Sequence, residues 1–134
     1  MNTKSVLIVD DDPAFRQLMS VVLTDDAYQL EFAGGGRQAL EMTEAKRYDA
    51  IVLDLKMPDV SGFDVLEGLK ASAPGIPCVI IISAASDKLI ESIVTPNVIA
   101  RIRKPFEIAK LKGAISDCLR TPRPGATRPI DTLH

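Results

Sequence analysis

The sequence predicts an α/β fold in which a doubly wound, five-stranded parallel sheet with strand order 2-1-3-4-5 is covered by five helices. Two observations indicate this class. Short apolar runs alternate with segments whose apolar residues recur at helical spacing. Several of those short runs are also apolar throughout, which is typical of strands that are buried on both faces of a parallel sheet.

The five candidate strands differ in how apolar they are. Residues 6–9, 50–53 and 78–82 are continuous apolar runs rich in Val and Ile, so we expect them inside the sheet. Residues 28–32 alternate apolar with polar side chains, and residues 98–103 carry two arginines, so both suit an edge. This assignment fits the flavodoxin-like order, in which ligands bind beyond the carboxyl ends of the strands.

Five apolar stripes at helical spacing predict the helices. Asp12 followed by Pro13 is typical of an N-cap and first helical residue, and Pro96 ends the fourth helix. In chain order the stripes consist of Phe15, Leu18, Met19, Val22 and Leu23; Gly36, Ala39, Leu40 and Thr43; Phe63, Leu66 and Leu69; Leu89, Ile90 and Ile93; and Ile108, Leu111, Ile115, Cys118 and Leu119.

Length and composition favour one globular domain. The chain has 134 residues, of which we assign 1–120 to the domain and 121–134, with three prolines, to a flexible tail or linker stub. A net charge of −2 and the absence of Trp disfavour nucleic-acid binding. No apolar run approaches the ~20 residues that span a bilayer. Residues 1–5 lack a signal peptide's apolar stretch, so we expect a cytoplasmic protein with no membrane contact.

The two cysteines, Cys78 and Cys118, match neither a metal-binding spacing nor a disulfide framework. Both occupy apolar segments. We therefore expect them to be packed as separate buried thiols.

Acidic residues gather in the first half of the chain. Residues 1–68 carry 13 acidic and 6 basic side chains, whereas residues 69–134 carry 5 acidic and 10 basic ones. This asymmetry indicates either an acidic site built mainly from the first half or solvated helix faces that differ by chance.

Chemically reactive side chains follow the predicted strands. Asp10 and Asp11 follow the first strand, Asp54 the third, Ser83 the fourth and Lys104 the fifth. The carboxyl ends of parallel strands share one edge of the sheet, so we expect these groups to meet there. Taken singly, Ser83 or Lys104 would be an ordinary turn residue or surface charge, and the acidic run an ordinary loop.

Carboxylates brought this close need a counter-charge. Two of them 4 Å apart repel by roughly 4 kcal/mol at an effective dielectric constant near 20. Mg²⁺ relieves such repulsion and prefers carboxylate, water and phosphate oxygens. Asp54 beside a metal, the Lys104 ammonium and the Ser83 hydroxyl together predict a phosphoryl-transfer site with an aspartyl phosphate as its covalent state.

Four segments in order resemble the receiver domain of response regulators in two-component signalling. They are Val-Leu-Ile-Val-Asp-Asp-Asp-Pro-Ala-Phe-Arg at 6–16, Asp-Leu-Lys-Met-Pro-Asp-Val-Ser-Gly at 54–62, Ile-Ile-Ile-Ser-Ala at 80–84 and Lys-Pro-Phe at 104–106. The resemblance covers residues 4–120.

The resemblance implies a role for each acidic residue. Asp54 accepts a phosphoryl group from a phosphohistidine on a sensor histidine kinase or a histidine phosphotransfer protein. Asp11, Asp54 and the backbone carbonyl of Lys56 ligate Mg²⁺, and Asp10 acts through a metal-bound water.

The same resemblance assigns the second half of the site. Ser83 and Lys104 hold phosphoryl oxygens, the small Ala84 leaves access to the phosphate, and the Lys104–Pro105 peptide bond is cis. The chain departs from the family three positions before the lysine, where an aromatic switch residue is usual and Arg101 stands here.

We therefore expect a phosphorelay signalling switch that acts on an unidentified downstream protein through a changed surface. It would catalyse only its own phosphoryl transfer and slow self-dephosphorylation. Self-association through the fourth helix, residues 98–103 and the last helix is a further interaction to consider.

Two alternatives stay open. The first is a pseudo-receiver, an interaction module without phosphorylation: the absent aromatic residue favours it, whereas the complete acidic pair, Asp54, Ser83 and Lys104 disfavour it. A Mg²⁺-dependent aspartyl-phosphate phosphohydrolase resembling the haloacid dehalogenases would need a second Asp two positions after the nucleophile, where this chain has Lys56.

Overall fold

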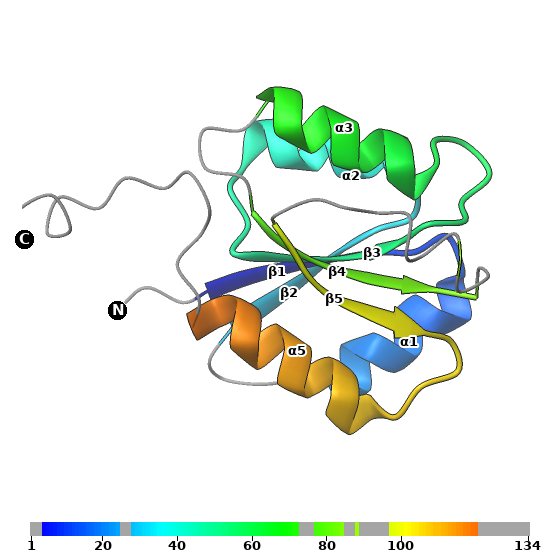
Figure 1. The fold of residues 1–134 in the computed structure, drawn as a ribbon, viewed down its shortest axis with the longest axis vertical. Helices are drawn as coiled ribbons and strands as arrows, with labels where there is room; N and C mark the ends of the chain where they lie inside the picture. Colours follow the sequence, from blue (N-terminus) through cyan, green and yellow to red (C-terminus); the bar gives the residue numbers. More distant parts are fainter. Residues whose placement is uncertain (1–3, 25–27, 73–76, 85–87, 89–96, 121–134) are drawn as a thin grey trace, which may run out of the picture.

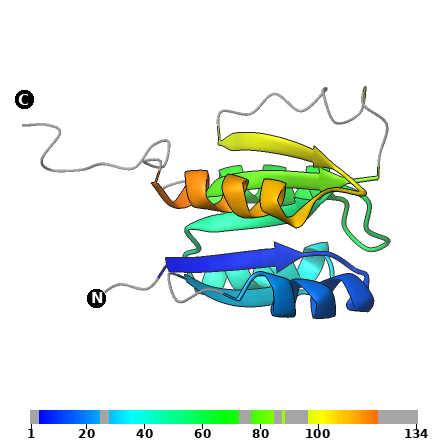
Figure 2. The same ribbon diagram turned by 90° about the horizontal axis from the view of Figure 1, so that it is seen from below.

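Five parallel strands form one sheet in the order β2-β1-β3-β4-β5, as the sequence predicts. The computed structural model describes residues 4–24, 28–72, 77–84, 88 and 97–120. Figures 1 and 2 show the twisted sheet with helices on both faces. The strands are β1 (Lys4–Val9), β2 (Tyr28–Ala33), β3 (Ala50–Asp54), β4 (Cys78–Ser83) and β5 (Val98–Arg103).

The helices divide between the two faces of the sheet. Helices α2 and α3 cover one face, and α1 and α5 cover the other (Figure 1). They are α1 (Pro13–Val22), α2 (Gly36–Ala45), α3 (Gly62–Ser72) and α5 (Ile108–Arg120). The fourth helix predicted around Leu89, Ile90 and Ile93 lies outside the described residues, as does the predicted tail at 121–134. Within the described part of the chain, no helix has the length and apolar character of a membrane span.

Alternate side chains of the inner strands enter two separate apolar layers. On β1, Leu7 and Val9 pack in the layer beneath α2 and α3, whereas Val6 and Ile8 pack in the layer beneath α1 and α5. All six residues of β4 are buried, while β5 alternates buried with exposed positions. The distinction between inner and edge strands is therefore confirmed, and it follows from which strands are covered on both faces.

Helix α1 begins where the sequence predicts. The Asp12 carboxylate accepts a 2.9 Å hydrogen bond from the Ala14 backbone N–H, and Pro13 is the first helical residue. A carboxylate at this position satisfies a backbone donor that the helix itself leaves unpaired. The cap therefore fixes the direction in which the chain leaves the Asp10–Asp11 segment.

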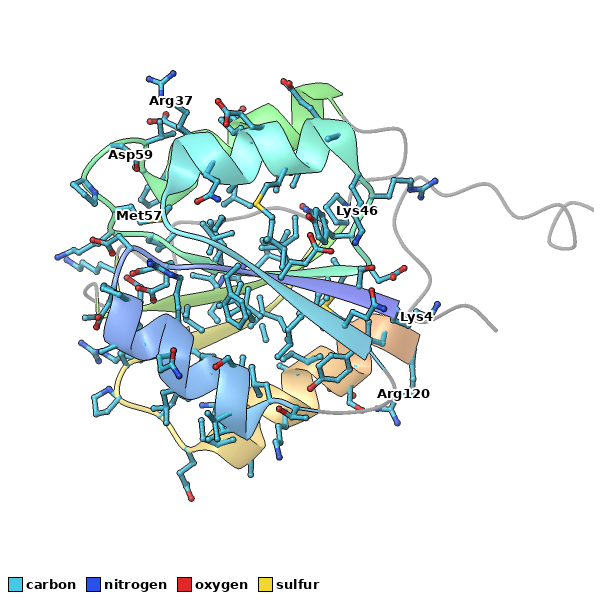
Figure 3. The ribbon with its side chains drawn as sticks, turned by 180° about the vertical axis from the view of Figure 1, so that it is seen from behind. Lys4, Arg37, Lys46, Met57, Asp59 and Arg120 are labelled. Carbon is cyan, nitrogen blue, oxygen red and sulfur yellow. A yellow bond between two sulfur atoms is a disulfide. The ribbon has the colours of Figure 1, made fainter. Side chains whose placement is uncertain are left out.

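Helix α2 is capped from a distant loop. Its N-cap residue, Gly35, has no side chain to offer, and Asp59 of the β3–α3 loop accepts hydrogen bonds from the backbone N–H groups of Gly36 and Arg37 at 3.1 and 3.2 Å. Figure 3 shows Asp59 beside Arg37 at this end of the helix. Backbone hydrogen bonds from Val60 and Arg37 lower the pKa of Asp59. The loop after Asp54 is thereby tied to α2.

The prediction of two separate thiols is wrong. Cys78, at the start of β4, and Cys118, in the last turn of α5, form a disulfide, with their Cα atoms 5.6 Å apart. Both side chains point into the layer shared by β4 and α5, and this Cα separation is typical of bonded cysteines. Sequence spacing could not reveal the pairing, because the two residues meet only once α5 packs on the sheet.

Candidate functional site

The carboxyl edge of the sheet gathers the predicted side chains. Oxygen atoms of Asp10, Asp11 and Asp54 all lie within 4.8 Å of one another. Asp10 and Asp11 follow β1, and Asp54 is the last residue of its neighbour β3. Lys104 enters from β5, and its ammonium reaches both Asp10 and Asp54. The parallel topology therefore brings together residues that lie almost one hundred positions apart.

Asp10 is fully buried, and its backbone N–H, its carbonyl and both carboxylate oxygens are hydrogen-bonded. Its backbone N–H continues the β1–β2 pairing with a 3.2 Å bond to the Ala33 carbonyl, and its own carbonyl accepts a 2.8 Å bond from the Arg16 guanidinium. One carboxylate oxygen accepts the Asp12 N–H at 2.9 Å, and the other accepts the Lys104 ammonium at 2.7 Å. Asp10 is therefore held rigidly, whereas the Asp11 side chain is exposed.

Asp54 is 5% exposed, and its two carboxylate oxygens have different neighbours. Oδ1 accepts the Lys56 backbone N–H at 3.1 Å, and Oδ2 lies 3.5 Å from the Lys104 ammonium. Burial raises the pKa of Asp54, and the nearby charge of Asp10 raises it further. The Lys56 N–H and the charge of Lys104 only partly offset this rise in the pKa. The ionised form of Asp54 is thus less favourable in the folded protein than in water.

Lys104 is the cation that pairs with the two buried carboxylates, Asp10 and Asp54. Burial alone lowers its pKa, but the hydrogen bond to Asp10 and the charges of Asp54 and Asp10 outweigh burial, so the pKa of Lys104 is raised overall. The ammonium therefore stays charged and supplies the counter-charge for the buried carboxylates. The Lys104–Pro105 peptide bond is cis, as the resemblance implies.

Ser83, Ala84 and Lys56 are the remaining predicted residues of the site, and hydrogen bonds from backbone N–H groups join Ser83 to Lys104 and Lys56 to Asp54. Ser83 is fully buried at the end of β4, and its carbonyl accepts the Lys104 backbone N–H at 2.9 Å. Ala84 is exposed, and Lys56 is exposed in the loop after Asp54. Arg101, at the departure from the family pattern, is exposed on β5.

Gly62 makes room for the backbone that carries Asp54. A Cβ atom at this position would lie 2.6 Å from the Asp54 carbonyl oxygen and 2.7 Å from the Leu55 Cα, both of which belong to the backbone. The Gly62 N–H donates a 3.0 Å hydrogen bond to the Leu55 carbonyl. The first residue of α3 therefore packs directly against the segment that follows β3.

Phe15 and Phe106 also belong to the site. The sequence places Phe15 only in the apolar stripe of the first helix. The Lys104 ammonium lies 4.3 Å from the centre of the Phe15 ring, and Phe15 packs against Phe106. Helical spacing correctly indicates that Phe15 faces inward, but it cannot indicate which charged group the ring meets. Arg16 was missed for the same reason, since its bond to the Asp10 carbonyl depends on the path of the loop.

The acidic cluster is able to hold a metal ion. Three carboxylates converge here, and Lys104 is the cation that contacts two of them. Carboxylate oxygens are the ligands that hard divalent cations prefer, and the exposed Asp11 leaves the cluster open on one side.

Comparison with known proteins agrees with this geometry. A family model described as the response regulator receiver domain matches residues 6–116. The probable transcriptional regulatory protein TcrX of Mycobacterium tuberculosis is 33% identical over 125 residues, covering 92% of this chain and 52% of TcrX. Sporulation initiation phosphotransferase F of Bacillus subtilis is 29% identical over 119 residues, covering 89% of this chain and 96% of that protein. The chain thus spans about half the length of TcrX.

A solved structure of a response regulator has a similar fold. The response regulator TrrA of Thermotoga maritima, in complex with Mg(2+)-BeF, superposes with a TM-score of 0.77 at 26% identity, covering 87% of this chain and all of that one. The family match spans most of the chain, and the strand order and the acidic cluster are those expected of the family. The chain therefore belongs to the response regulator receiver domain family.

Proposed function

We propose that this chain is a phosphorelay switch that accepts a phosphoryl group on Asp54 from a phosphohistidine of a sensor histidine kinase or a histidine phosphotransfer protein. One observation carries the proposal: the oxygens of Asp10, Asp11 and Asp54 converge within 4.8 Å beside the Lys104 ammonium. The family match and the similarity to a sporulation phosphotransferase support it.

The proposed step is a displacement at phosphorus. A carboxylate oxygen of Asp54 forms a bond to phosphorus while the bond from phosphorus to the donor imidazole nitrogen breaks. The electron pair of that bond stays on the imidazole, which takes up a proton from solvent. Lys104 and the Ser83 hydroxyl then hold phosphoryl oxygens, and the small Ala84 leaves the approach open.

The acidic residues fit Mg²⁺. Asp11, Asp54 and the Lys56 carbonyl would hold the ion directly, and Asp10 would act through a bound water. When bound, the ion neutralises negative charge at the transferring phosphoryl group. The Mg(2+)-BeF complex of TrrA supports this choice of metal. The chain's own contribution is to keep Asp10 and Asp54 rigid, since both are buried and hydrogen-bonded.

The output we propose is a changed protein surface rather than turnover of a substrate. Phosphorylation shifts the population between two conformers, and a downstream protein, or a second copy of the chain through β5 and α5, binds one of them. Arg101, exposed on β5, replaces the usual aromatic switch residue, so the surface change follows a different route here.

Intact-protein mass spectrometry tests the proposal. With Mg²⁺ and acetyl phosphate, we expect one phosphoryl adduct. The adduct should not form when a chelator removes Mg²⁺, nor in Asp54→Asn. Asp59→Asn is the matched control, because it removes a carboxylate from the same loop at an exposed position. The absence of any adduct would indicate a pseudo-receiver, and consumption of many donor equivalents per protein would indicate a phosphohydrolase.

A further inference from the structure

The Lys104 ammonium is enclosed on two sides by different kinds of group. On one side lie the carboxylates of Asp10 and Asp54, at 2.7 and 3.5 Å. On another side lies the ring of Phe15, with its centre 4.3 Å from the nitrogen. The face of an aromatic ring carries partial negative charge and attracts a cation at this distance. The ring thus attracts Lys104 in a way that does not depend on the charge state of either carboxylate.

A second ring fixes the first. Phe15 and Phe106 meet edge to face, with their centres 6.2 Å apart and their planes inclined at 76°. This arrangement is favoured between aromatic rings. Because Phe15 belongs to the first turn of α1 and Phe106 follows Lys104 by two positions, the pair joins α1 to the loop that carries the ammonium.

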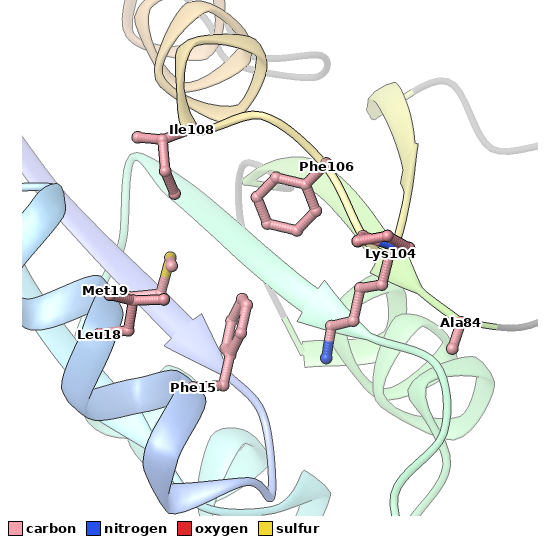
Figure 4. A pocket seen from close by; sticks show the side chains of 8 residues that line it. Phe15, Leu18, Met19, Ala84, Lys104, Phe106 and Ile108 are labelled. Carbon is pink, nitrogen blue, oxygen red and sulfur yellow. The ribbon is translucent and has the colours of Figure 1, made fainter.

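The two rings line a mainly apolar cavity of about 400 Å³, with Lys104 as the charged residue among its lining side chains. Figure 4 shows the Lys104 ammonium extending toward Phe15. The Lys104 side chain is 23% exposed, so water has limited access to it. Limited access strengthens the attraction between ring and cation, and it restricts a long side chain that would otherwise adopt many rotamers.

We propose that Phe15 is a positioning residue that holds the Lys104 ammonium beside Asp54 while Asp54 is converted from a carboxylate to an acyl phosphate. This inference rests on the proposed function and extends it to a residue outside the acidic cluster. As the charge on Asp54 changes, the pull of its carboxylate on Lys104 changes too, whereas the pull of the ring persists. Lys104 therefore needs little rearrangement to meet a phosphoryl oxygen.

Fluorination of the ring tests the role of its charge without changing its shape. Phe15 is replaced by 4-fluorophenylalanine and by 3,4,5-trifluorophenylalanine, which progressively remove the negative potential of the ring face. With acetyl phosphate and Mg²⁺, an oxygen of Asp54 bonds to phosphorus and acetate leaves with the electron pair. We expect the rate constant at saturating donor to fall in the order of fluorination, by about threefold to tenfold for the trifluorinated ring. The half-saturating donor concentration should stay unchanged.

Matched variants separate charge from packing. Phe15→Tyr keeps the ring face and should retain the parent rate constant, whereas Phe15→Leu should lose about as much as the trifluorinated ring. Val21→Ala shortens another apolar residue of α1 that is 65% exposed and is not part of the cavity lining, and it should leave the rate constant unchanged. Equal rate constants for the parent and both fluorinated proteins would overturn the proposal.

A readout that needs no phosphorylation keeps the two proposals distinguishable. The Lys104 Hε protons should show an upfield ring-current shift in the NMR spectrum, assigned by its loss in Lys104→Arg and abolished in Phe15→Leu. If the parent accepts no phosphoryl group but shows the shift, the proposed function fails while Phe15 still holds Lys104. If the shift is absent, the role of Phe15 is wrong even when phosphorylation proceeds.

Discussion

The Lys104 ammonium donates a 2.7 Å hydrogen bond to Asp10, although 94 positions separate the two residues along the chain. Asp10 stands after β1 and Lys104 after β5, on opposite sides of the two strands that carry Asp54 and Ser83. The bond therefore links the carboxyl ends of β1 and β5 across the two strands that lie between them. It also makes Lys104 the counter-charge of a carboxylate that is entirely removed from solvent.

Removing this cation should destabilise the fold. Lys104→Met leaves Asp10 buried without its charged partner, which we expect to lower the free energy of unfolding by about 1–3 kcal/mol. Urea titrations in the presence of a chelator measure the change. In the Asp10→Asn background, where the amide carries no charge, adding Lys104→Met should lower the free energy of unfolding by much less. A cost that is equal in both backgrounds would mean that the two residues do not stabilise each other.

The raised pKa of Asp54 predicts how stability depends on pH. The folded protein binds the Asp54 proton more tightly than the unfolded chain does, so stability falls as pH rises from the ordinary Asp value of 3.8 through the raised pKa. Asp54→Asn cannot ionise. Without metal, the free energy of unfolding of Asp54→Asn should therefore rise relative to that of the parent as pH increases through this range, and the difference should stay constant above it. Urea titrations of both proteins at several pH values measure this difference. A difference that does not change with pH would contradict a raised pKa of Asp54 in the folded protein.

Two glycines should respond in opposite directions to the same substitution. Gly62→Ala places a methyl group against the backbone of Asp54 and Leu55, and we expect a loss of about 1–3 kcal/mol from the resulting strain. Gly113→Ala adds a methyl group to an exposed position of α5 that has nothing within 4 Å, and it should gain about 0.5–1 kcal/mol. Urea titration of both variants checks this. A Gly62→Ala variant as stable as the parent would show that the α3 start can move away from Asp54.

The disulfide should make stability depend on reducing agents. Cys78 and Cys118 are 40 positions apart, so their bond closes a loop that includes Ser83 and Lys104. Loop closure of this length restricts the unfolded chain, and reduction should lower the free energy of unfolding by about 2–4 kcal/mol. The double variant Cys78→Ala and Cys118→Ala is the control, because its stability should not respond to reductant. A parent protein equally stable with and without reductant would contradict this expectation.

The sequence was sufficient where backbone topology decides the outcome. Apolar runs identified β1, β3 and β4 as inner strands, and the strand order then placed Asp10, Asp54, Ser83 and Lys104 at one edge. It was insufficient where side-chain direction decides, because hydrophobic periodicity reports burial but not the neighbour that a buried group meets. The Cys78–Cys118 bond and the Phe15 ring against Lys104 are both of this kind.

The position of the phosphoryl group tests most directly whether Asp54 is the phosphoacceptor. After reaction with acetyl phosphate and Mg²⁺, borohydride reduces an aspartyl phosphate to homoserine, and peptide mapping locates the altered residue. We expect homoserine at position 54 and at no other aspartate position, and we expect none when the metal is chelated. Modification at Asp10, Asp11 or Asp59, or no modification in a folded protein, would contradict this role of Asp54.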